Sequence, residues 1–209
     1  LSPGGRVELA LEYAITVPSG SDGAYGAFAF TDGVLSLAYA CPLIPASWTW
    51  ERAPPVPYGD FLAAEAGFFR ARVSLPEGWQ LMGAGAGESR RARDGRTITI
   101  LALGPARDLY LAAVKDYVRR ERREGSVIVA SLAPKGSEEG AELALEAAAE
   151  ALRSFSRRFG PYPYRRLALV AAPLDDAYGC EFSGIILLAS RKYDTVREAR
   201  RVIPENSQP

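Results

Sequence analysis

The 209-residue sequence contains no histidine and only two cysteines, Cys41 and Cys180. Zinc sites in proteins use imidazole, thiolate and carboxylate ligands, so a site made from this chain would depend on these two thiols and on carboxylates. The cysteines lie far apart in the sequence and lack the Cys-x-x-Cys spacing of metal and redox sites. We therefore expect two unpaired thiols, and no metal or cofactor held by this chain.

The sequence also has no excess of either charge and no long apolar run. Twenty-five basic residues balance 25 acidic ones, so no overall field attracts nucleic acid or anionic lipid. The arginine clusters at 90–93 and 119–123 have acidic neighbours and no interleaved aromatic residues, which favours solvated surface over a nucleic-acid site.

The run Ile185–Ala189 is far shorter than the roughly 20 residues that cross a bilayer. We expect a soluble protein with no membrane span. A leader could have been removed before Leu1, so cytoplasmic and exported locations both stay open.

Short strands dominate the first part of the sequence. Apolar residues occupy the odd-numbered positions from 7 to 17, which predicts a half-buried strand, and Asp32-Gly33 between apolar runs predicts a hairpin. Further strands are predicted at 69–75, 79–82, 97–103 and 109–117, while the glycine-rich segment 83–87 is read as a strand connection. The sequence thus predicts a mainly β N-terminal domain over residues 1–123, an antiparallel sandwich or curved sheet.

The pattern changes at the charged run 119–125, where we place a domain boundary. A strand is predicted at 127–130, and Ser137 followed by two glutamates predicts the start of a helix. The helix presents an apolar face and ends at Gly160-Pro161, before an apolar strand at 167–172. The expected apolar face is formed by Leu145, Ala148, Leu152, Phe155 and Phe159. Residues 124–209 are therefore predicted to be an α/β segment.

The order of several motifs resembles the M1 (gluzincin) zinc metallopeptidases. The motifs are the Leu-Pro-Glu-Gly-Trp turn at 75–79, the helix ending in Phe-Gly-Pro-Tyr-Pro-Tyr at 159–164, the apolar strand at 167–172, and Gly-Cys-Glu at 179–181 before a second apolar strand. The resemblance spans almost the whole chain. It implies a saddle-shaped β-domain followed by the truncated start of a thermolysin-like catalytic domain.

The resemblance also implies a role for the Gly-x-Glu loop. Glu181 falls on the glutamate that, in aminopeptidase members, pairs with the α-ammonium group of the substrate, and Cys180 stands where methionine is usual. Gly179 would let a peptide backbone approach closely, and the strand after Gly184 could accept the peptide along its edge. The expected substrate-binding residues are thus Gly179, Cys180 and Glu181. A loop carboxylate that caps a neighbouring backbone group is the alternative for Glu181.

Catalytic residues cannot be assigned in this chain. The family binds zinc through His-Glu-x-x-His and a further glutamate, and the tail 201–209 is too polar and proline-bounded to be that zinc helix. We expect a fragment of an M1-like zinc aminopeptidase, a hydrolase whose intact form would hold zinc, with this chain inactive by itself. The alternatives are a non-catalytic M1-like scaffold or peptide-binding module, and an independent carbohydrate- or protein-binding β-sandwich.

A truncated catalytic domain would leave its last strands uncovered. Ile185–Leu188 would then expose apolar surface or a free strand edge, which would favour self-association through the strands after Gly184.

Overall fold

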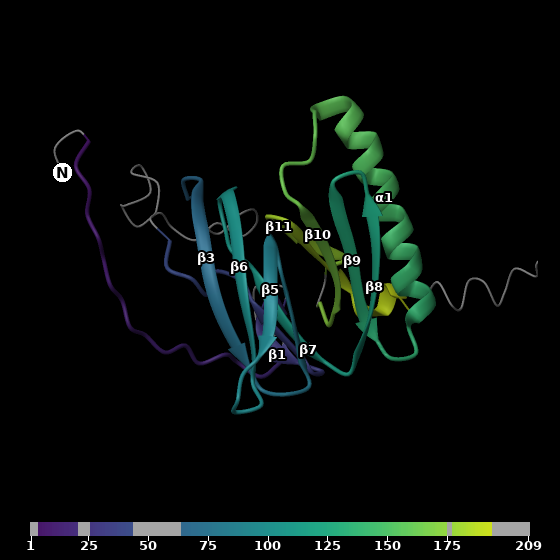
Figure 1. The fold of residues 1–209 in the computed structure, drawn as a ribbon. Helices are drawn as coiled ribbons and strands as arrows, with labels where there is room; N and C mark the ends of the chain where they lie inside the picture. The colour runs from purple at the N-terminus through teal and green to yellow at the C-terminus, as the bar shows by residue number, and fades with distance from the viewer. Residues whose placement is uncertain (1–3, 21–25, 44–63, 175–176, 194–209) are drawn as a thin grey trace, which may run out of the picture.

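The structure is a computed structural model that describes residues 4–20, 26–43, 64–174 and 177–193, and within them the fold is mainly β (Figure 1). The first part of the chain forms two antiparallel sheets, a four-stranded sheet in the order β1-β2-β7-β4 and a three-stranded sheet in the order β3-β6-β5. Their strands are β1 (Phe28–Thr31), β2 (Val34–Leu37), β3 (Gly67–Leu75), β4 (Trp79–Gly83), β5 (Ala86–Arg91), β6 (Thr97–Ala106) and β7 (Leu111–Lys115). The prediction of a β-rich, sandwich-like first part is confirmed.

The second part forms a mixed five-stranded sheet in the order β11-β12-β10-β9-β8. Its parallel centre is β9, β10 and β12, with antiparallel β8 and β11 at the two edges. The elements are β8 (Tyr117–Glu124), β9 (Val127–Pro134), α1 (Glu138–Phe159), β10 (Arg166–Ala172), β11 (Gly179–Phe182) and β12 (Ile185–Ala189). The helix connects β9 to β10, as a crossover between parallel strands requires.

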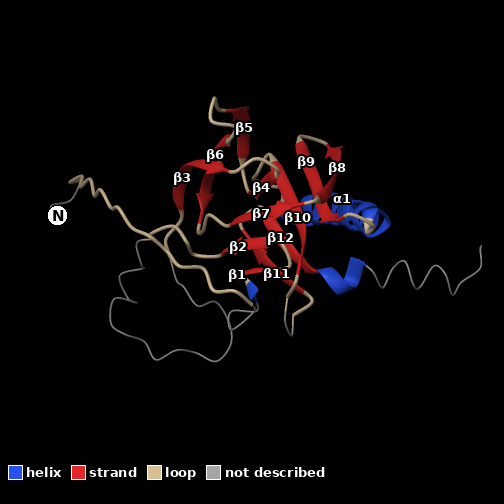
Figure 2. Ribbon diagram, turned by 90° about the horizontal axis from the view of Figure 1, so that it is seen from below, coloured by secondary structure: helices blue, strands red, loops and turns tan. Residues whose placement is uncertain are grey.

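The sheets and the helix stack in layers (Figures 1 and 2). The three-stranded sheet packs on one face of the four-stranded sheet through a cluster that includes Leu101 and Leu111. The other face of the four-stranded sheet packs on the five-stranded sheet, and their shared core includes Tyr110, Val170 and Leu187. Because β7 lies between two cores, four of its five residues are buried.

Local sequence signals explain the elements that were predicted correctly. The β1–β2 turn uses Asp32 at φ 50° and Gly33 at φ 77°, the left-handed conformations that Asp-Gly accepts in tight hairpins. The helix begins after Ser137 and ends before Gly160, and Leu145 and Leu152 face β9 and β10 in a compact cluster. The basic side chains Arg157 and Arg158 lie in its last turn, where their positive charge interacts favourably with the negative end of the helix dipole.

Three predictions about secondary structure are wrong. The segment 7–17 forms no strand and exposes its apolar side chains, with Leu9 at 73% and Leu11 at 68%. The predicted strand connection 83–87 is too long, because only residues 84 and 85 lie between β4 and β5, and β5 pairs with β6. The charged run 119–125 is strand β8 and its turn, because every residue of β8 pairs with β9. The proposed boundary at 123/124 falls at the end of β8.

The predicted apolar face of the helix is only partly buried. Leu145, Ala148 and Leu152 are buried, whereas Phe155 is 58% exposed and Phe159 is 81% exposed. Both phenylalanine side chains instead line an open groove beside the sheet. Most of the proline- and tryptophan-rich segment 41–60 and the tail 201–209 lie outside the described residues. Within the described ranges, no helix combines the length and hydropathy required to cross a membrane.

Candidate peptide-binding groove

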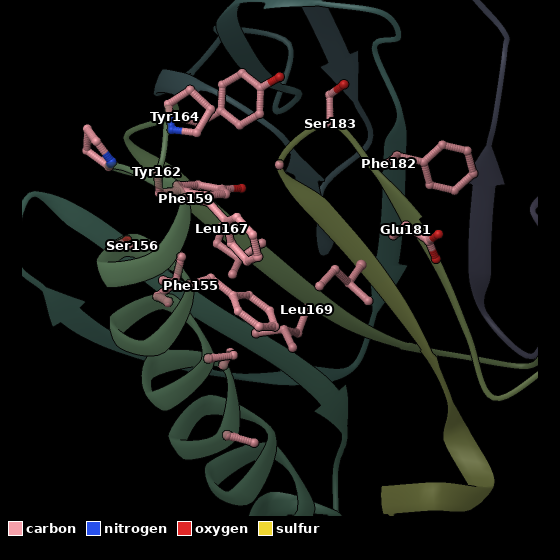
Figure 3. A pocket seen from close by; sticks show the side chains of 18 of the residues that line it. Phe155, Ser156, Phe159, Tyr162, Tyr164, Leu167, Leu169, Glu181, Phe182 and Ser183 are labelled. Atoms are coloured by element: carbon pink, nitrogen blue, oxygen red, sulfur yellow. The ribbon is translucent and has the colours of Figure 1, made fainter.

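An open apolar groove of about 660 Å³ lies beside the helix on the five-stranded sheet (Figure 3). The helix packs against β8 and β9, so no helix among the described residues covers the same face of β10 and β12. Four leucine and isoleucine side chains line this part of the groove, namely Leu167, Leu169, Ile186 and Leu188. In the described part of the chain, the groove therefore arises because one helix packs over a sheet of five strands.

Aromatic residues form one wall of the groove. Phe155 and Phe159 lie at the end of the helix with their ring centroids 6.1 Å apart. Tyr162 and Tyr164, in the loop that follows, contact edge to face at 5.5 Å, and the Tyr164 hydroxyl donates a hydrogen bond of 3.2 Å to the Pro105 carbonyl. Burial raises the pKa of Tyr162, and the neighbouring Tyr164 raises it further, so the phenol stays neutral at physiological pH.

The opposite rim of the groove carries Glu181, as Figure 3 shows. The sequence predicted a loop here, but residues 179–182 form β11, which pairs antiparallel with β12. Strand alternation exposes Gly179 and Glu181 and half-buries Cys180 and Phe182. The Glu181 carboxylate forms no hydrogen bond or ion pair with any other described residue, so nothing in that part of the chain supports a capping role.

Two contacts from the first part of the chain hold the β11–β12 turn in place. The Phe182 ring stacks on Tyr110 with centroids 4.2 Å apart and planes at 16°. The Asp108 carboxylate accepts hydrogen bonds from the Ser183 backbone N–H at 3.0 Å and from the Ser183 hydroxyl at 3.2 Å. These contacts fix the residues that directly follow Glu181, so its direction is set by the packing of the two parts of the chain.

The residues that flank Glu181 also have roles inside the hairpin. A Cβ atom at Gly179 would lie 3.1 Å from the Leu187 carbonyl oxygen, so the hairpin itself favours glycine there.

Cys180 affects the ionisation of Tyr110. Burial is the main cause of the raised pKa of Tyr110, the Ser36 hydroxyl opposes this shift, and Cys180 adds to it. No disulfide joins Cys180 to Cys41, and burial raises the pKa of the Cys41 thiol.

The expected strand edge is in a different place. β12, the strand after Gly184, is hydrogen-bonded to β11 on one side and to β10 on the other, so it offers no free edge. Within the described ranges the edge strand at this end of the sheet is β11, the strand that carries Glu181. Ile186 and Leu188 contribute half-buried apolar surface to the groove.

The predicted residues Gly179, Cys180 and Glu181 all lie on β11, and the structure adds contacts with residues that the sequence did not indicate. Asp108 and Tyr110 lie more than 70 residues before the turn that they hold, so no local pattern could have revealed them. No group of three or more histidine, cysteine or acidic side chains in the described residues could hold a metal ion. The family's zinc ligands therefore do not fit the residues present, and we derive no catalytic step through zinc.

The sequence matches no protein-family model, and it matches no curated protein. The geometry of the groove and the order of the sequence motifs are therefore the basis for the functional argument.

Proposed function

We propose that this chain is part of an M1-like architecture and binds the amino terminus of a peptide, with Glu181 as the partner of the α-ammonium group. The observation that carries the proposal is an accessible carboxylate on an open strand edge at the rim of an apolar groove. The motif order from residue 75 to residue 188 supports the same assignment.

Each part of the groove has a chemical role in this proposal. The unpaired backbone groups of β11 hydrogen-bond an extended peptide as an added strand, which is a common mode of peptide recognition. Glu181 selects the end of the peptide, because only a free amino terminus supplies a cation at that position. The apolar floor and the aromatic wall accept a nonpolar side chain beside the amine.

Hydrolysis requires groups that this sequence does not contain. Without histidine, the 209 residues cannot form the His-Glu-x-x-His ligand set, so in this proposal catalytic zinc belongs to residues outside them. The second candidate is a non-catalytic peptide-binding module of the same architecture, and the absence of histidine favours it. Both candidates share the amine-binding step, and both predict that the 209-residue chain does not cleave peptides.

The test compares binding of two peptides that differ only at the amino terminus. Fluorescence anisotropy would measure the affinity of the chain for a short apolar peptide labelled at its carboxyl end, with the α-amine free or acetylated. We expect the free amine to bind up to about fivefold more tightly, because an exposed ion pair contributes at most about 1 kcal/mol. Glu181→Gln should abolish the difference while keeping the size of the side chain.

Glu150→Gln is the matched control, because Glu150 is an exposed carboxylate on the helix outside the groove lining. Equal binding of the two peptides to the unmodified chain would refute the amine-binding role. Stoichiometric zinc together with turnover of an aminoacyl reporter by the 209-residue chain would refute its predicted inactivity.

A further inference from the structure

The amino-terminal segment and strand β3 have complementary surfaces that the groove does not use. Residues 4–12, which we call the arm, are exposed throughout, with Val7, Leu9 and Leu11 at 58%, 73% and 68%. These apolar side chains alternate with Glu8, Ala10 and Glu12. The arm therefore has the side-chain pattern of a strand with one apolar face, but it has no strand partner in the described chain.

β3 is an open edge with the matching pattern. Its only described partner is β6, so no described strand pairs with the backbone groups on the other edge of β3. Phe69, Ala71 and Val73 are half-buried against the core below, whereas Arg70 and Arg72 point to solvent. Neither arginine forms an ion pair with another described residue, and neither do Glu8 and Glu12.

We infer that β3 accepts the arm of a second copy of this chain as an added antiparallel strand. A register that sets Glu8 across from Arg72 also sets Val7, Leu9 and Leu11 across from Val73, Ala71 and Phe69. The acidic and basic side chains then share the solvent face, and the apolar side chains extend the buried face. When each copy gives its arm to the β3 edge of the other, the backbone groups of both arms and both β3 edges gain hydrogen-bond partners, as a twofold dimer requires.

The chain's own arm is held away from this arrangement. The Tyr13 hydroxyl donates a hydrogen bond of 3.0 Å to the Ala40 carbonyl, and Phe30 N–H donates one of 2.9 Å to the Pro18 carbonyl. These contacts fix the base of the arm beside β1 and leave residues 4–12 extending beyond Tyr13. Figure 1 shows the arm running in the same direction as β3, so antiparallel pairing falls to a second copy.

The test is a charge exchange across the inferred strand pair, measured by sedimentation velocity over a range of protein concentrations. The unmodified chain should form a concentration-dependent dimer. Glu8→Arg and Arg72→Glu should each weaken the dimer about threefold to tenfold, and the double variant should recover most of the loss. Glu146→Arg, an exposed residue on the helix, is the control and should leave the dimer unchanged.

Three results would overturn the inference. The first is a monomer at all concentrations. The second is hydrogen-exchange protection of β3 by the arm that does not depend on protein concentration, because that result would mean that the arm pairs within its own chain. The third is a dimer that ignores both charge variants but is lost with Phe155→Glu, because that result would place the interface at the groove. Greater protection of β3 amides at higher protein concentration would support the inference.

Discussion

The carboxylate of Asp108 is expected to fix the Glu181 hairpin, and Asp108→Ala tests this directly. The substitution removes the acceptor of two hydrogen bonds and leaves the Ser183 backbone N–H without its partner at a part-buried site. Hydrogen bonds to a charged group contribute about 1.5–3 kcal/mol, and partial exposure places the expected loss near the lower end, at about 2 kcal/mol. Ser183→Ala removes only the hydroxyl bond and should cost about 1 kcal/mol.

The assay is urea unfolding of the single variants and of the double variant. Because both substitutions remove the same hydroxyl bond, the double variant should be more stable than the sum of the two losses predicts, by about 1 kcal/mol. Asp108→Asn retains a carbonyl acceptor and should lose less stability than Asp108→Ala. Glu146→Ala on the exposed helix surface serves as the control. Unfolding of Asp108→Ala at the same urea concentration as the unmodified chain would refute the reasoning.

Three further predictions follow from the packing. Gly184→Ala should destabilise the fold by about 2–4 kcal/mol in urea unfolding, because Gly184 has φ 75° and a Cβ atom there would lie 2.8 Å from the Ala84 Cβ. The stability of the fold should be retained below pH 10 and fall as the pH rises toward 12, because burial raises the pKa of Tyr117 and of Tyr193 to about 12. Thermal unfolding at a series of pH values tests this. A melting temperature that does not change up to pH 12 would contradict it. Phe155→Ser should reduce binding of a dye for exposed apolar surface without loss of stability, because Phe155 is 58% exposed at the groove wall; undiminished fluorescence would contradict it.

Local chemistry made much of the fold predictable. The Asp32-Gly33 turn and the boundaries of the helix follow from residues adjacent in the sequence, and the structure confirms both. The strand at 69–75 was predicted because its alternation is strong and its turn at 76–78 is clear. In each case a few neighbouring residues determine the backbone conformation, so no knowledge of distant partners is needed.

The errors arise where a distant partner decides the outcome. The arm has the alternation of a strand, but pairing requires an edge that its sequence does not specify. The charged run 119–125 predicted a domain boundary, but an edge strand such as β8 can carry charges on its exposed side chains and still pair through its backbone. Phe155 has helical spacing, yet its burial depends on whether anything covers β10 and β12.

The sequence proposes the residues of the candidate site, but it does not contain their geometry. Glu181 was identified from a short motif, and the structure places it at the groove rim. Its position on an edge strand, the stacking of Phe182 on Tyr110, and the Asp108 contact all join segments far apart in the chain. Such contacts depend on how the sheets pack, which one sequence does not reveal.

The two margins of the five-stranded sheet differ in how readily they admit another strand. β8 closes one margin with four arginines and two glutamates, several of them engaged in ion pairs such as Arg166–Glu121 and Arg153–Glu124. A strand that paired with β8 would have to accommodate these charged side chains, and natural sheets use such charged edges to prevent edge-to-edge aggregation. At the opposite margin, β11 carries one acidic side chain and no basic one. If the sheet accepts a further strand, this difference in charge favours addition at β11 over addition at β8.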